Sequence, residues 1–235
     1  MNSKKLTFFD ILKTEDDYLN ELNNENRDIS LGLLKKIWQE NRPDYKTFCD
    51  DGILIEDDWD NSRTKILFLL KETFKDFSVI KGKQGPKGNS NTFWRKMQMW
   101  TNITDKIYSG NEASHKDAKA SKENPNKEIA YVNIKKNVTK DKQAYKTNSE
   151  DDDIKKYAVS DAKLLKKQID LINPDVIICC GTYKYIKHIL PLNIENSHLY
   201  GKKWVVDFKH LSNRNPYQKD NEDLISKLEN IKNCR

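Results

Sequence analysis

The chain has 235 residues, of which 36% are hydrophobic and 33% are charged, and its formal net charge is +6 at pH 7. A chain of this length can bury one good core, so one α/β domain is favoured over two small ones, and the polar composition predicts long solvated inserts. The charge suits a polyanionic partner, but only six of the 42 basic residues are arginine, a lysine-rich bias that an AT-rich genome also produces.

The cysteines and the apolar segments exclude several classes of protein. Cysteines stand at positions 49, 179, 180 and 234, with neither a CxxC pair nor a metal-ligand spacing, which argues against a zinc site and a disulfide framework. A reducing cytoplasm is the expected compartment. The first residues lack the pattern of a signal peptide and no apolar run could cross a bilayer, so we expect a soluble cytoplasmic protein without a membrane partner.

Residues 1–64 are expected to form a helical N-terminal part. Apolar residues spaced by three and four predict helices within residues 14–41, with Asp28 or Ser30 capping the second helix. An acidic stretch follows over residues 44–64. Its aspartates match no metal-ligand spacing and are interpreted as a solvated face; they stand at positions 50, 51, 57, 58 and 60.

Strands and helices alternate along the rest of the chain. Continuous apolar runs, typical of strands buried on both faces of a sheet, lie at 65–70, 129–134, 175–180 and 204–208. Helical spacing is found at about 92–100, 154–172, 183–190 and 220–231. Polar inserts are expected at about 103–128 and 135–153. The alternation predicts an α/β fold in a single domain over residues 1–235, a three-layer αβα sandwich with a central four-stranded, mainly parallel sheet.

Polar side chains follow three of the predicted strands. Glu72, Asn133 and His210 stand at or just beyond the strand ends, and open α/β sheets bind ligands outside the carboxyl ends of their strands. Each residue also has an ordinary structural interpretation: a salt-bridge partner for Glu72, a turn residue for Asn133 and a structural histidine for His210. The functional interpretation is a carboxylate that orients water, an amide that reads a nucleobase edge and an imidazole in an active-site loop.

The segment after the last predicted strand reads His210-Leu211-Ser212-Asn213-Arg214-Asn215-Pro216. It resembles the last motif of the uracil-DNA glycosylase superfamily, closest to the single-strand-selective monofunctional branch, where that motif is His-Pro-Ser-Pro-Arg-Asn-Pro. Five of the seven positions agree. Glu72 takes the place of the water-positioning residue of the family's first motif, although the usual Gly and Pro are absent there. Val132-Asn133-Ile134-Lys135-Lys136 is similar to the middle motif, Thr-Asn-x-x-Lys.

The resemblance implies a monofunctional DNA glycosylase that hydrolyses the N-glycosidic bond of uracil or another modified base flipped out of DNA, in repair or in defence against foreign DNA. It implies Glu72 and His210 as catalytic residues, and Asn133 and Phe93 as base-binding residues. The DNA-binding residues that it implies are Lys71, Ser212, Asn213 and Arg214.

The expected partner is DNA, and no cofactor or metal is expected. The iron–sulfur cysteines of some branches are missing, so the resemblance implies no cluster. Two alternatives stay open. One is a catalytically inactive glycosylase-like module that only binds DNA, and the other is an enzyme acting on free nucleotides or nucleosides. The sequence carries no indication of an oligomeric state.

Overall fold

The computed structural model describes residues 15–22, 25–42, 45, 48–72, 92–118, 129–137, 151–193, 198–211 and 215–234. Its helices are α1 (Glu15–Glu21), α2 (Arg27–Asn41), α3 (Glu56–Asp60), α4 (Thr92–Tyr108), a 3-10 helix (His115–Asp117), α5 (Asp151–Ser160), α6 (Ala162–Ile172), α7 (Tyr183–Ile189) and α8 (Tyr217–Asn233). Its strands are β1 (Gly52–Ile53), β2 (Ile66–Leu70), β3 (Ile129–Asn133), β4 (Val176–Cys180), β5 (Leu199–Tyr200) and β6 (Lys203–Phe208).

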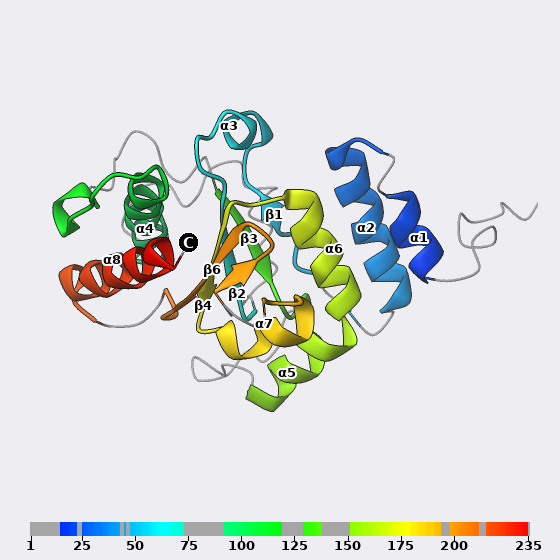
Figure 1. Ribbon diagram of the computed structural model, residues 1–235. Coiled ribbons are helices and arrows are strands. Elements are labelled where there is room, and N and C mark those ends of the chain that lie inside the picture. Colours follow the sequence, from blue (N-terminus) through cyan, green and yellow to red (C-terminus); the bar gives the residue numbers. More distant parts are fainter. Residues whose placement is uncertain are drawn as a thin grey trace, which may run out of the picture.

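The strands form one six-stranded mixed sheet in the order β1-β3-β2-β4-β6-β5 (Figure 1). β3, β2, β4 and β6 pair with their neighbours in parallel, while β1 and β5 add to the two edges in antiparallel orientation. The α/β class expected from the sequence is confirmed. The expectation of four strands is wrong, because β1 and β5 have two residues each and are too short to produce a strand pattern.

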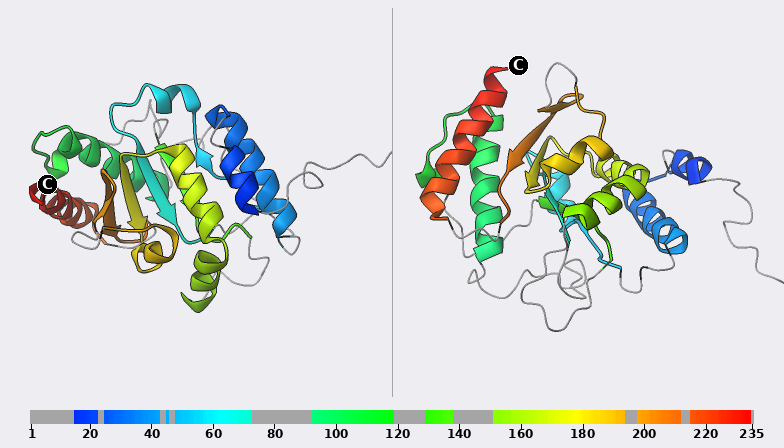
Figure 2. Two further views of the ribbon diagram at one scale, coloured as in Figure 1. Left: turned by 45° about the vertical axis from the view of Figure 1, so that its right-hand side comes forward. Right: turned by 90° about the horizontal axis from the view of Figure 1, so that it is seen from below.

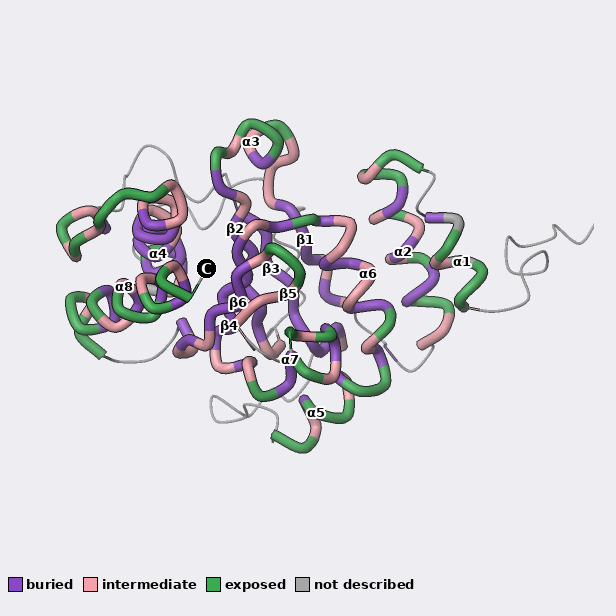
Figure 3. Tube along the Cα trace, in the orientation of Figure 1, coloured by how far each residue is buried: buried purple, intermediate pink, exposed green. Residues whose placement is uncertain are grey.

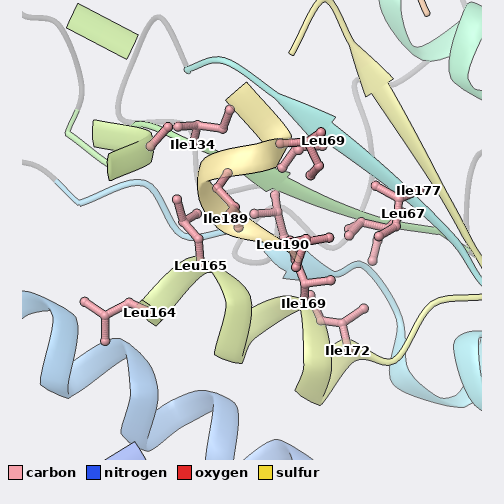
Figure 4. Packing of buried hydrophobic residues seen from close by; sticks show 14 of the residues in the cluster. Leu67, Leu69, Ile134, Leu164, Leu165, Ile169, Ile172, Ile177, Ile189 and Leu190 are labelled. Carbon is pink, nitrogen blue, oxygen red and sulfur yellow. The ribbon is translucent and has the colours of Figure 1, made fainter. Parts of the chain in front are cut away.

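Side chains of the parallel strands point alternately to two apolar clusters, as the two-residue period of a strand requires. One cluster, here the α6 face, contains Leu67, Leu69, Ala130, Val132, Ile177, Cys179 and Val205 with side chains of α2, α5, α6 and α7 (Figure 4). The other, the α4 face, contains Ile66, Phe68, Leu70, Tyr131, Ile178, Cys180 and Phe208 with side chains of α4 and α8. Helices therefore cover both faces of the sheet, and β2, β3 and β4 are buried along their length (Figures 2 and 3).

The order of the parallel strands fixes where a ligand crevice can form. The chain leaves β2, passes through α4 on one face and returns as β3; it then crosses over β2 through α5 and α6 on the other face to reach β4. Connections that leave a strand toward opposite sides create a switch point, and ligands of doubly wound folds bind there, outside the carboxyl ends of the strands. The switch point of this sheet lies at the ends of β2 and β4.

The helix expected over residues 154–172 is two helices, α5 and α6, which meet at Asp161. The side chain of Asp161 is fully buried and accepts hydrogen bonds from Trp38 Nε1 at 3.0 Å, Arg42 Nε at 2.8 Å and Tyr45 Oη at 2.7 Å. These donors all come from α2 and the segment after it. The break thus places a carboxylate where it anchors α2 and the segment after it, a contact that the periodicity of one segment cannot predict.

Other boundaries also differ from the expected ones. Residues 103–108, expected in the first polar insert, belong to α4, with Ile103 and Ile107 buried on the α4 face. Residues 151–153, expected in the second insert, begin α5, while residues 119–128 and 138–150 lie outside the described part of the chain. The cap of α2 is Asn26, whose side chain accepts a hydrogen bond from the backbone N–H of Asp28 at 2.9 Å, and not Asp28 or Ser30. Among the described helices, none is long and apolar enough to cross a membrane.

A buried ion pair joins the two helices of the α4 face. Lys96 Nζ of α4 lies 2.7 Å from Asp220 Oδ2 of α8, and both side chains are at most 1% exposed. Asp220 also accepts a hydrogen bond from Asn215 Nδ2 at 3.2 Å. Removing one member of such a pair leaves an uncompensated charge in a medium of low dielectric constant.

We therefore expect Asp220→Asn to lower the free energy of unfolding by about 3–5 kcal/mol, measured by chemical denaturation. The control is Asp223→Asn, a substitution in the same helix that removes a more exposed carboxylate, which pairs with Lys209. It should cost at most about 1 kcal/mol. Equal losses in the two variants would show that burial of the Lys96–Asp220 pair does not matter.

Candidate functional site

Gly181, directly after β4, lies between Lys71, which follows β2, and His210, which follows β6. Its φ of +70° lies in the left-handed region, which favours glycine, and its N–H donates to the carbonyl of Phe208 at 2.7 Å. A Cβ atom placed on Gly181 would lie 3.7 Å from His210 Cβ and 4.0 Å from Lys71 Cε. The side chains of Lys71 and His210 therefore approach one another across the end of β4, at the switch point of the sheet.

His210 is largely buried beside a positive charge. Burial is the larger cause that lowers the pKa of its imidazole below the ordinary value, and the charge of Lys71 lowers it further. The ring is consequently neutral at pH 7. A neutral imidazole has one N–H donor and one acceptor nitrogen, so His210 can donate a hydrogen bond without carrying a charge.

Glu72 lies at the end of β2 within an ion-pair network. Its side chain is 5% exposed, and its Oε2 lies 3.5 Å from Nζ of Lys135, which follows β3. Lys135 also donates to Asp153 Oδ2 at 2.7 Å and lies 5.3 Å from the centre of the Tyr157 ring. Burial tends to lower the pKa of Lys135. The hydrogen bond to Asp153 and the charge of Glu72 outweigh the effect of burial, and the pKa is raised. The carboxylate of Glu72 thus has a cationic neighbour held in place by α5.

Asn133, the last residue of β3, is 1% exposed. Its amide Nδ2 donates to Asp51 Oδ2 at 3.1 Å and to Cys49 Sγ at 3.4 Å, and its backbone N–H donates to the same Asp51 oxygen at 2.7 Å. Burial raises the pKa of the Cys49 thiol, which therefore stays protonated. The amide oxygen Oδ1 is buried and has no hydrogen-bond partner within the described part of the chain.

Asp51 is the centre of this network, and the interpretation of it as part of a solvated face is wrong. Lys136 Nζ, which is fully buried, lies 2.7 and 2.8 Å from its two carboxylate oxygens, and Gln168 Nε2 of α6 donates to Oδ1 at 2.9 Å. Lys136 also donates to Gln168 Oε1 at 2.8 Å. The apolar residues that follow Asp51 in the sequence, including Ile53, are the one local indication that it enters the core.

The remaining predicted site residues have different surroundings. Phe93, in the first turn of α4, is half-buried and meets Trp94 edge-on with ring centroids 5.3 Å apart. Lys71 Nζ lies 3.2 Å from Asp151 Oδ1, so its charge is partly balanced by the start of α5. The predicted DNA-binding residues Ser212, Asn213 and Arg214 lie outside the described residues.

The three predicted polar residues lie at the carboxyl ends of the parallel strands, but their side chains make different local contacts. Glu72 and Asn133 come from neighbouring strands, β2 and β3, whereas His210 follows β6 on the far side of β4. Glu72 contacts Lys135, Asn133 contacts Asp51, and His210 lies near Lys71. Asp51 is outside the predicted site, and Lys135 and Lys136, which belong to the segment similar to the middle motif, carry no predicted role. Among the described residues, no group of three or more His, Cys, Asp or Glu side chains is arranged to hold a metal ion.

Comparison of the chain with protein-family models, with curated proteins and with solved structures finds no match.

The network around Asp51 gives a stability prediction. Asp51→Asn removes the carboxylate that balances the buried Lys136, and we expect the free energy of unfolding to fall by about 3–5 kcal/mol in chemical denaturation. Asp50→Asn is the matched control, because Asp50 pairs with Lys35 at a more exposed position, 2.8 Å apart. It should cost at most about 1 kcal/mol. If Asp51→Asn also lowers the free energy of unfolding by at most about 1 kcal/mol, the result contradicts the described network.

The lowered pKa of His210 gives a pH prediction. As the pH falls below about 6.5, the unfolded chain binds a proton at this residue before the folded chain does, so the free energy of unfolding falls. His210→Gln removes this loss. The stability of wild type relative to His210→Gln should therefore be smaller at pH 5.5 than at pH 7.5. A relative stability that is constant or rises toward low pH would show that the pKa is not lowered.

Proposed function

We propose that the protein is a monofunctional DNA glycosylase that hydrolyses the N-glycosidic bond of uracil or another modified base flipped out of DNA. The observation that carries this proposal is the placement of a carboxylate, an amide and an imidazole at the switch-point edge of a doubly wound sheet. Glu72, Asn133 and His210 follow β2, β3 and β6, in the chain order of the motifs that the sequence resembles. Fold alone does not fix function, so the proposal depends on these side chains.

The chemistry requires stabilisation of two developing charges. As the glycosidic bond breaks, the sugar becomes positive and the departing base becomes negative. A neutral His210 donates an N–H hydrogen bond to the base anion, an interaction that strengthens as the charge develops. Glu72 holds the attacking water and accepts its proton as the C1′–O bond forms, and its carboxylate favours the cationic sugar. Lys135, beside Glu72, keeps this carboxylate in a fixed position.

Substrate binding requires that the base leave the DNA stack, because its glycosidic bond is inaccessible in a stacked strand. Asn133 contacts the edge of the flipped base and Phe93 stacks on its face. Ser212, Asn213 and Arg214 contact the phosphates, which position the strand without reading its sequence. Lys71 contributes to phosphate binding only if the DNA displaces Asp151, its partner in the free protein.

An oligonucleotide screen tests this function. Single- and double-stranded oligonucleotides, each with one candidate base, are incubated with purified protein and treated with alkali to cleave abasic sites. Wild type should produce cleavage at one base or more, and His210→Gln should slow it about 100-fold, the effect of removing one donor to a developing anion. His115→Gln, in the 3-10 helix, is the control and should keep the wild-type rate. If His210→Gln and Asn133→Leu both match wild type on a processed base, the assigned roles are wrong.

The second candidate is a glycosylase-like module that binds DNA without chemistry. The ion pair of Glu72 with Lys135 favours it, since a salt-bridge partner needs no catalytic role. This candidate predicts DNA binding that weakens with salt, and no abasic product from any base tested.

A further inference from the structure

The carboxylate of Asp151, at the start of α5, is held by three donors from two other parts of the fold. Lys71 Nζ, after β2, lies 3.2 Å from Oδ1, and Tyr185 Oη of α7 donates to the same oxygen at 2.7 Å. Lys184 Nζ, also of α7, donates to Oδ2. The hydrogen bonds from Lys184, Tyr185 and Lys71 lower the pKa of the Asp151 carboxyl well below its ordinary value. The three donors thus surround one ionised group that has two acceptor oxygens.

One of these donors is fixed in position by burial. Tyr185 is 2% exposed and belongs to the apolar cluster of the α6 face. Burial is the main cause that raises the pKa of its phenol, so the hydroxyl stays protonated and remains a donor. Asp151 differs, since 57% of its side chain is exposed. The tyrosine donor therefore keeps its position when the Asp151 side chain turns toward water.

A hollow beside Asp151 gives another anion access to the same donors. It has a volume of about 280 Å³ and lies between α5 and α7, which pack side by side (Figure 1). Its lining includes Asp151 and Asp152, together with Lys155, Lys184 and Lys187. The positive charges of these residues outnumber the negative ones even with Asp151 in place. An anion that replaces Asp151 therefore enters a cationic part of the surface.

The donors also adjoin the switch point of the sheet. A Cβ atom placed on Gly181 would lie 4.0 Å from Lys71 Cε and 3.7 Å from His210 Cβ. A phosphate beside Lys71 would therefore lie next to a nucleotide bound at His210. Each phosphodiester of DNA carries one negative charge and has two terminal acceptor oxygens, as a carboxylate does. Lysine and tyrosine side chains are ordinary donors to these oxygens.

We propose that Lys71, Lys184 and Tyr185 form a binding site for a phosphate of the DNA backbone, which Asp151 occupies in the free protein and leaves when DNA binds. The inference rests on the DNA binding of the proposed function and adds the contact that limits its affinity. DNA must break the ion pairs of Asp151 before its own phosphate can replace the carboxylate. Because a phosphate contact reads no sequence, Asp151 lowers the affinity for every DNA sequence to the same extent.

Substitution of Asp151 tests the inference through DNA affinity at physiological ionic strength. Fluorescence anisotropy measures the binding of single-stranded oligonucleotides with one 2′-fluorodeoxyuridine, whose electron-withdrawing fluorine disfavours the cationic sugar and blocks cleavage. Asp151→Asn should raise the affinity about 10-fold, because two exposed ion pairs no longer have to be broken. The matched control is Asp152→Asn, which removes an equal charge from the same turn of α5, whereas Lys71 and Lys184 pair with Asp151. It should raise the affinity at most about 2-fold.

A second substitution separates a specific phosphate contact from a general change in charge. Tyr185→Phe keeps the buried ring and the net charge but removes the hydroxyl donor. In the Asp151→Asn background it should weaken DNA binding about 5-fold, the effect of one lost hydrogen bond. In the wild-type background the loss should be smaller, because the same hydroxyl also holds Asp151 in the site and the two effects oppose each other. Equal losses in the two backgrounds would overturn the competition between Asp151 and phosphate.

Titration calorimetry with inorganic phosphate identifies the source of the anion. If Asp151→Asn binds inorganic phosphate more tightly than wild type does but binds DNA no better, the site belongs to a free phosphate compound and the DNA contact is overturned. Equal DNA affinities of wild type and Asp151→Asn, or equal increases in Asp151→Asn and Asp152→Asn, would also overturn it.

The outcomes distinguish this inference from the proposed function. A specific increase of DNA affinity in Asp151→Asn, without cleavage of any base in the oligonucleotide screen, would support the inference and contradict the glycosylase. Cleavage by wild type without that increase would do the reverse. If none of the proteins binds DNA, both are contradicted.

Discussion

The buried carboxylate of Asp51 is the constraint on which the candidate site depends. A charge that is 1% exposed must be neutralised where it lies, and Lys136 neutralises it at 2.7 Å. Such a pair adds little net stability compared with an apolar replacement, so its main effect is on geometry. It joins the segment before β1 to the segment after β3 and to α6, and thereby fixes the direction in which the chain leaves β3. Asn133 and Lys135 take their positions from that direction.

The doubly wound sheet provides the rest of the geometry. Because helices cover both faces, the central strands are largely apolar, and Glu72, Asn133 and His210 stand where three of them end. Because the connection from β3 to β4 crosses over β2, the switch point lies between the ends of β2 and β4, beside Lys71 and Gly181. His210 joins them from β6, beside Gly181, whose φ of +70° is the feature that favours glycine at this position. The neutral imidazole of His210 and the ion-paired carboxylate of Glu72 thus both lie at the carboxyl ends of the parallel strands.

The sequence predicts the parts of this structure that depend on local pattern. The apolar runs locate the central strands, and the residues after them include Glu72, Asn133 and His210. The sequence does not predict contacts between residues that are distant along the chain. Asp51 and Lys136 are 85 residues apart, and Asp161 and Trp38 are 123 apart. The local sequence around a carboxylate that pairs across such a distance does not differ from that around a carboxylate exposed to solvent. The sequence therefore predicts a solvated face for Asp51 and one continuous helix across Asp161.

The most direct test of this account is a crystal structure of the protein with an oligonucleotide that carries 2′-fluorodeoxyuridine. We expect a flipped base at the carboxyl ends of the parallel strands, with its N3 within about 3 Å of Asn133 Oδ1 and a carbonyl oxygen facing His210. The Asp51–Lys136 pair should be unchanged. A base bound elsewhere, or one that contacts neither Asn133 nor His210, would contradict the account.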